Sequence, residues 1–133
     1  MSDIFLDTVG LIALWDESDQ WQSVAGAAMT LLNVPGTRLI TTTYILLECG
    51  NSAARKPYRT DVCLLRNRLE RERCLISPSD ADLVDAWSAY QRGDAGSAGI
   101  VDHVSFAVMH RLGITDAFTN DRHFKAAGFR TLF

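Results

Sequence analysis

The 133-residue sequence contains only three cysteines, only three prolines and no long apolar segment. The cysteine count is odd and no C-x-x-C pair is present, which argues against a disulfide framework and against a structural zinc site. We expect Cys49, Cys63 and Cys74 to be reduced packing residues of a cytoplasmic protein. No apolar run approaches the roughly 20 residues that span a bilayer, so no membrane association is expected.

The charge balance excludes a strongly basic chain. Thirteen Lys and Arg residues against 16 Asp and Glu residues give a formal net charge of -3, so a polyanionic partner would need a local cationic patch. Asp3 and Asp7 interrupt the first residues and no basic segment precedes them, so we expect no signal peptide. The 47% hydrophobic content is sufficient for a core, and the length indicates one domain over residues 1–133.

Short apolar or β-branched segments alternate with segments of helical periodicity. Strands are expected near residues 4–6, 38–42, 74–76, 117–119 and 130–133. Helices are expected through Leu11 and Trp15, over 20–32, 44–55, from Thr60-Asp61, from Ser79, over 100–112 and over 121–127. This alternation predicts an α/β fold, a three-layer α/β/α arrangement with a mostly parallel sheet of four to five strands.

Several helix ends have local signals. Thr60-Asp61 predicts an N-terminal cap, and Ser79 with Asp82 resembles a capping box that has Asp in place of the usual Glu. Gly113 predicts the end of the helix over 100–112. In a parallel sheet the first turn of each helix lies at the carboxyl edge, where ligands bind in open α/β folds.

Four carboxylates lie at such strand-to-helix junctions or in the opening turns of a helix: Asp7, Glu48, Asp102 and Asp121. If the strands form one parallel sheet, all four meet at the same edge. Four acids placed together cannot all stay ionised without a cation. The pattern therefore predicts a divalent metal held by oxygen ligands, and such metals serve phosphate chemistry.

Each acid also has an ordinary structural explanation. Asp7 and Asp121 fit helix N-caps, Glu48 fits a solvated helix face, and Asp102 fits an acid that stabilises a helix N-terminus. These explanations account for single positions and not for their coincidence at one edge. Ser105, three residues after Asp102, could orient that acid or hold a metal-bound water.

The remaining candidates are weaker. His103, His110 and His123 lack metal-ligand spacing, so we expect them to be structural or exposed. No Ser-His-Asp or Cys-His arrangement competes with the acids. The aromatic residues are expected in the core rather than as base-stacking platforms; they include Trp15, Trp21, Phe106 and Phe124.

Basic residues concentrate in one segment. Seven of the 13 Lys and Arg residues are Arg55, Lys56, Arg59, Arg66, Arg68, Arg71 and Arg73. One interpretation is a surface that binds RNA or docks an acidic partner. The other is a solvated helix face interleaved with Glu70 and Glu72. Arg122 and Lys125 lie next to Asp121 and are better placed to contact phosphate.

Four stretches carry a resemblance to a known family. They are FLDTVGLIALWDESDQW at 5–21, TTTYILLECGNSAARK at 41–56, GIVDHVSFAVMHRLGI at 99–114 and AFTNDRHFKAAGF at 117–129. The sequence resembles PIN-domain nucleases, and within them the ribonuclease toxins of VapBC-type (type II) toxin–antitoxin modules. The motifs are an Asp after the first strand, a Glu in the helix after the second, D-x-x-S-F and T-x-D-x-x-F.

The resemblance implies a metal-dependent endoribonuclease that uses Mg²⁺, with Mn²⁺ as an alternative. The four acids occupy the family's metal and catalytic positions; Thr8 and Ser105 are candidate supporting residues. A cognate antitoxin, an RNA substrate and a homodimer are also implied, and apolar surface on the first two helices could serve such contacts. The alternative hypothesis is a non-catalytic α/β module whose acidic edge binds a cation or a protein.

Overall fold

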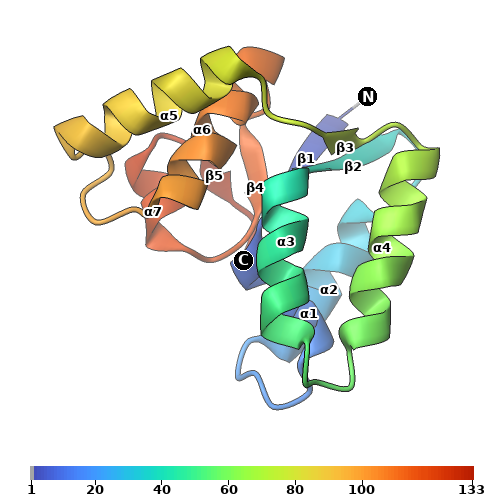
Figure 1. The fold of residues 1–133 in the computed structure, drawn as a ribbon. Coiled ribbons are helices and arrows are strands. Elements are labelled where there is room, and N and C mark those ends of the chain that lie inside the picture. Colours follow the sequence, from blue (N-terminus) through green and yellow to red (C-terminus); the bar gives the residue numbers. More distant parts are fainter. Residues whose placement is uncertain (1) are drawn as a thin grey trace.

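Five strands, all parallel, form the central sheet, and the computed structural model describes residues 2–133 (Figure 1). The strands are β1 (Ser2–Leu6), β2 (Thr37–Thr42), β3 (Leu75–Ile76), β4 (Asp116–Phe118) and β5 (Arg130–Thr131). The helices are α1 (Thr8–Trp15), α2 (Gln22–Leu32), α3 (Thr43–Ala53), α4 (Arg59–Arg71), α5 (Asp80–Arg92), α6 (Ile100–Leu112) and α7 (Arg122–Ala126). The strand order is β3-β2-β1-β4-β5.

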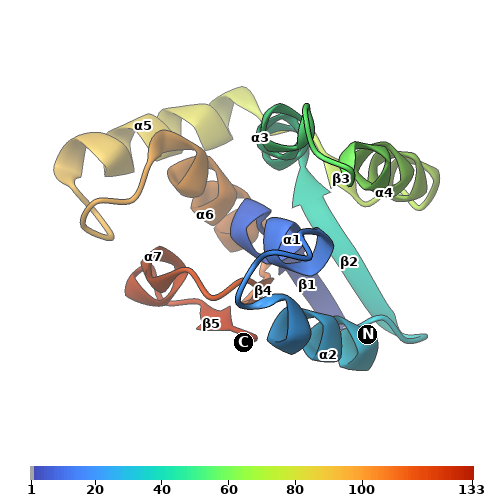
Figure 2. The same cartoon turned by 90° about the horizontal axis from the view of Figure 1, so that it is seen from below.

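The helices form layers on both sides of the sheet, which confirms the predicted three-layer α/β/α arrangement. Arg68 of α4 donates to Asn33, the residue directly after α2, at 3.0 Å, so α2 and α4 lie on the same side of the sheet. Figures 1 and 2 show α5 and α6 packed together on the other side. Connections between parallel strands run through helices, as parallel pairing requires. No helix within residues 2–133 has both the length and the hydrophobicity needed to cross a membrane.

The central strand is buried over its second half. β1 pairs with β2 on one side and β4 on the other, and Phe5 lies opposite Ile40 and Ala117. Its apolar run is buried from Ile4 to Leu6 because helices cover both faces, which is typical of parallel sheets. The order of strands therefore places the carboxyl ends of β1, β2 and β4 side by side.

Two predicted helix ends are confirmed and one is wrong. Ser79 Oγ accepts from the Asp82 N–H at 3.1 Å and Asp82 accepts from the Ser79 N–H at 2.8 Å, which completes the capping box. Gly113 ends α6 in the left-handed region at φ 70°. Thr60-Asp61 is not a cap, because the preceding turn starts α4 at Arg59 and leaves both residues in the first turn.

Several large apolar side chains are exposed, and Trp21, which was predicted to be in the core, is one of them. Trp21 is 44% exposed because α2 begins one residue later and Trp21 lies at its N-cap, outside the buried face. Phe106 and Phe124 are in the core as predicted. On α5, Val84, Trp87 and Tyr90 also face outward.

A close backbone approach joins α1 to β4. A Cβ built on Gly10 would overlap the carbonyl oxygen of Phe118, whereas a Cβ on Gly26 in the middle of α2 would meet nothing within 4 Å. Only glycine at position 10 lets the start of α1 lie directly over the end of β4. This approach holds Asp7 against the segment that follows β4.

We predict that Gly10→Ala lowers the free energy of unfolding by about 3 kcal/mol or more, because backbone atoms would have to move. Gly26→Ala is the matched control and should raise it by up to about 1 kcal/mol through helix propensity. Urea unfolding of both variants measures this difference. Equal stability of the two variants would contradict the close approach.

Candidate metal centre

The four predicted acids all come from the carboxyl edge of the sheet. Asp7 follows β1 and caps α1, and Asp121 follows the end of β4 and caps α7. Glu48 is in the second turn of α3, and Asp102 is in the first turn of α6. α1 contacts α3, α3 contacts α6, and α6 contacts α7, so the four helix starts surround one site (Figure 2).

Asp7 is the most buried of the four, at 2% exposure. Its Oδ2 accepts a hydrogen bond from Thr119 Oγ1 at 2.8 Å and one from the Val9 N–H at 3.3 Å. Burial raises the pKa of Asp7 to about 7, and the charges of Asp102 and Asp121 add to this effect against the two hydrogen bonds. Near neutral pH this carboxyl is therefore only partly ionised when no cation is bound.

Glu48 is held by the neighbouring helix. Thr8 Oγ1 donates to Glu48 Oε1 at 2.7 Å, which links the start of α1 to α3 and does not involve Oε2. This hydrogen bond gives a geometric basis to the supporting role predicted for Thr8. Cys49, the next residue, is buried, and burial raises the pKa of its thiol to about 12, consistent with a packing residue.

Asp102, Asp121 and His123 form the tightest part of the site. One ligand atom from each lies within 4.8 Å of the others. His123 Nδ1 is 2.9 Å from Asp121 Oδ1 and 4.0 Å from Asp102 Oδ2. Burial raises the pKa of Asp102 to about 6, with further increases from the charges of Asp121 and Glu48.

The structure corrects the sequence-based view of two residues. His123 was expected to be structural or exposed, but it lies in the acidic cluster because Asp121 caps α7 and accepts from the His123 N–H at 2.9 Å. Ser105 makes no hydrogen bond to Asp102, so the first of its two predicted roles is wrong; the second, holding a metal-bound water, stays a prediction. Its side chain is fully buried, and its Oγ has no hydrogen-bond partner within the described part of the chain.

Thr119 is a further site residue, although in the sequence it stands out only as the first position of the T-x-D-x-x-F motif. Its hydroxyl donates to Asp7 and accepts from the Asp121 N–H at 3.1 Å. Thr119 is completely buried. It connects the acid after β1 to the acid after β4, and the two-residue spacing from Asp121 was the available signal.

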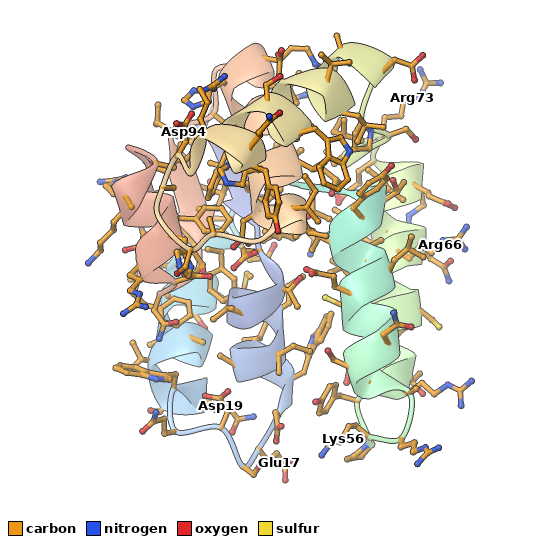
Figure 3. All side chains as sticks on the ribbon, turned by 60° about the vertical axis from the view of Figure 1, so that its left-hand side comes forward. Glu17, Asp19, Lys56, Arg66, Arg73 and Asp94 are labelled. Carbon is orange, nitrogen blue, oxygen red and sulfur yellow. The ribbon has the colours of Figure 1, made fainter. Side chains whose placement is uncertain are left out.

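The basic residues divide into two groups. Arg66 pairs with Glu70 and Arg68 with Glu72 along α4, as a solvated helix face would. Figure 3 shows Arg66 and Arg73 on the outer side of α4, directed away from the rest of the molecule. Arg122 and Lys125 are exposed on α7, one and four residues after Asp121.

The donor set fits a hard divalent cation. Carboxylate oxygens are the ligands that Mg²⁺ and Mn²⁺ prefer. The raised pKa values of Asp7 and Asp102 show that burial and like charges disfavour full ionisation. A bound cation would remove this penalty, so the same arrangement that is unfavourable alone favours metal binding.

Comparison with known proteins agrees with this geometry. Residues 4–130 match the PIN domain family model. The chain is 33% identical over 135 residues to the 23S rRNA-specific endonuclease VapC20 of two Mycobacterium tuberculosis strains, and the match covers 95% of each chain.

Solved structures show the same fold. The crystal structure of M. tuberculosis VapC20, described as a Sarcin-Ricin loop cleaving toxin, superposes with a TM-score of 0.78 and 25% identity over 95% of both chains. FitAcB from Neisseria gonorrhoeae superposes with a TM-score of 0.66 at 16% identity, covering 98% of this chain and 96% of the other, which shows the fold alone. The resemblance stated from the sequence is confirmed: this chain belongs to the PIN domain family.

Proposed function

We propose that this protein is a metal-dependent endoribonuclease that hydrolyses RNA phosphodiester bonds and acts as the toxin of a toxin–antitoxin pair. The observation that carries the proposal is the convergence of four carboxylates from distant segments, two of them with raised pKa values. Membership of the PIN domain family and similarity to the VapC20 endonuclease support it. The proposed metal and catalytic residues are Asp7, Glu48, Asp102 and Asp121.

The proposed cofactor is Mg²⁺, with Mn²⁺ as an alternative. Asp102 and Asp121 would hold the ion directly, with Asp7 and Glu48 completing the anionic pocket. When bound, the ion supplies Lewis-acid stabilisation of charge on the scissile phosphate and an activated water. The protein supplies the rest: Thr119 fixes the orientation of Asp7, and Thr8 fixes that of Glu48.

The free oxygen of each restrained carboxylate can accept a proton. Asp7 uses Oδ2 for the Thr119 and Val9 hydrogen bonds, which leaves Oδ1 for the pocket. Asp7 is therefore our candidate for taking the proton of the attacking water.

RNA is the proposed substrate, and 23S rRNA is the first candidate because the relatives at 33% identity are named for it. Arg122 and Lys125 are the proposed phosphate contacts, since both are exposed beside Asp121. Cleavage-site mapping on total RNA and on intact ribosomes tests this proposal. A single dominant cut in 23S rRNA would support this substrate. Cuts confined to other RNAs would show that 23S rRNA is not the substrate.

We also propose two protein contacts, a cognate antitoxin and a second copy of this chain. Exposed large apolar side chains lie on several helices, and two helices carry more than one of them. On α2 these are Val24 and Leu31, and on α5 they are Val84, Trp87 and Tyr90. Such residues on a folded surface are typical of interaction sites when they gather on one face.

We predict that Asp7→Asn and Asp102→Asn each lower the rate of metal-dependent RNA cleavage by at least about 100-fold, because Asp102→Asn removes a charged oxygen ligand and Asp7→Asn removes the proposed proton acceptor. Cleavage of a labelled RNA by the purified variants measures this. Glu72→Gln, directly after α4, is the matched control and should cleave at the wild-type rate, because Glu72 pairs with Arg68 on the surface. Undiminished cleavage by both Asp variants would end the proposal.

The pKa of Asp7 predicts how stability depends on pH. The folded protein keeps a proton on Asp7 up to about pH 7, whereas the unfolded chain releases it near pH 3.8. Without metal, stability should therefore fall as pH rises through this window, and Asp7→Asn should be more stable than wild type at pH 8 by up to roughly 4 kcal/mol.

Thermal unfolding at pH 5 and pH 8 measures this effect. The Asp7→Asn difference should be smaller at pH 5 than at pH 8, and Mg²⁺ should raise the wild-type Tm more at pH 8 because the ionised acids bind it. RNA cleavage should decline as pH falls from 7 to 6. A Tm difference that does not change with pH would contradict the assigned pKa.

We predict that the purified chain has twice its 14.7 kDa mass by light scattering. Two charge-introducing pairs then locate the interface: Val24→Glu with Leu31→Glu on α2, and Val84→Glu with Trp87→Glu on α5. The pair on the contacting face should return the mass of the monomer, because it buries uncompensated charge. A wild-type mass equal to one chain would contradict the homodimer.

A further inference from the structure

His123 occupies a position in the acidic cluster that its hydrogen bonds alone do not explain. The imidazole comes from the first turn of α7 and faces two carboxylates from different elements, Asp121 and Asp102. The side chain is 22% exposed, so the ring is largely covered by protein. Asp121 Oδ1 is already held by the His123 backbone N–H, so the ring is not needed to fix that oxygen.

The distances around Nδ1 match those between ligands of one ion. For a six-coordinate ion with ligands at about 2.1 Å, adjacent ligands lie about 3 Å apart and opposite ligands about 4.2 Å apart. His123 Nδ1 is 2.9 Å from Asp121 Oδ1 and 4.0 Å from Asp102 Oδ2. A cation could thus be held by the three side chains with little movement of their heavy atoms.

The other ring nitrogen of His123, Nε2, has the kind of hydrogen-bonding partner that metal-binding histidines use. Ser97 Oγ lies 3.0 Å from His123 Nε2. Metal-binding histidines usually donate their second N–H to an acceptor, which fixes the tautomer and the orientation of the ring. A serine hydroxyl both donates and accepts hydrogen bonds, so Ser97 suits either tautomer of His123. Without a cation, Ser97 can donate to Nε2 while Nδ1–H bonds Asp121. With a cation, Ser97 can accept from Nε2–H while the Nδ1 lone pair faces the ion.

Ser97 is placed by turns in the loop between α5 and α6. The Gly96 N–H bonds the Gly93 carbonyl at 3.1 Å, and the Ala98 N–H bonds the Ala95 carbonyl at 3.4 Å. Gly99 then caps α6, which carries Asp102 three residues later. The loop therefore fixes both the partner of the imidazole and the start of the helix that supplies one of the acids.

The other two histidines do not share this geometry. His103 is buried between the rings of Tyr90 and Phe106. His110, in the last turn of α6, packs its ring 4.8 Å from that of Phe129. His110 is exposed, so it provides a control of the same residue type.

We propose that His123 is a nitrogen ligand of the cation held by Asp102 and Asp121, with Ser97 as its hydrogen-bonding partner. The inference rests on the proposed function, since it needs a metal at this site. It adds a consequence for selectivity. Imidazole favours first-row transition ions over Mg²⁺, so His123 should shift the preference of the site toward Mn²⁺ or Co²⁺.

The test uses the purified full-length chain with Mn²⁺ as the probe. Pulsed EPR of bound Mn²⁺ should show ¹⁴N coupling from imidazole in the wild type and in His110→Ala, and none in His123→Ala. His123→Ala should also weaken Mn²⁺ binding by about 10-fold or more, measured by titration, while Mg²⁺ binding changes much less. Ser97→Ala should weaken Mn²⁺ binding in the same direction.

His123→Asn separates a ligand from a positioning role. The Asn amide keeps a donor for Asp121 but is a poor ligand for Mn²⁺, so it should not restore Mn²⁺ affinity or nitrogen coupling. Restored affinity would overturn the ligand assignment. The wild-type spectrum tests for nitrogen coordination of Mn²⁺ by itself, whether or not a variant folds. Circular dichroism identifies any variant that fails to fold.

Two failures can be told apart. If Mn²⁺ binds, Asp102→Asn abolishes binding and the wild type shows no ¹⁴N coupling, the inference about His123 is wrong and the proposed metal-dependent function stands. If no saturable Mn²⁺ site depends on Asp102, the metal site itself is wrong and both proposals fall.

Discussion

Repulsion between carboxylates in a partly buried site is the constraint on which the rest of the structure depends. Burial and mutual charge raise the pKa values of Asp7 and Asp102 to about 7 and about 6. A chain folded only for stability would not place ionisable oxygens this way, since such groups cost free energy unless paired. The sheet holds them together because its carboxyl edge collects the starts of α1, α3, α6 and α7.

The supporting contacts orient the acids without neutralising them. Thr119 bonds both Asp7 and the backbone of Asp121, and Thr8 bonds Glu48. Hydroxyl groups fix the position of a carboxylate but leave its charge available to a cation, unlike an arginine. An ion pair elsewhere in the fold shows the contrast: the buried Asp82, bound twice by the exposed Arg111, has a pKa lowered to about 2.

Much of this could be predicted from the sequence. The parallel α/β fold and the four acids at its edge followed from strand and helix periodicity, because the topology of a parallel sheet determines where helix starts meet. His123 was missed because spacing along the chain says little about ligand sets that assemble across elements. Trp21 and the Thr60-Asp61 cap were wrong for a local reason, since the ends of α2 and α4 depend on turns that periodicity does not locate.

Asp121 shows why structural and functional explanations of one residue need not exclude each other. Its Oδ1 caps α7 through the His123 N–H, which is what an N-cap aspartate ordinarily does. The same bond brings the His123 side chain to the carboxylate, with Nδ1 at 2.9 Å from Asp121 Oδ1. The cap therefore builds the site: the residue that ends the loop after β4 also sets the distance between an oxygen and a nitrogen that face one pocket.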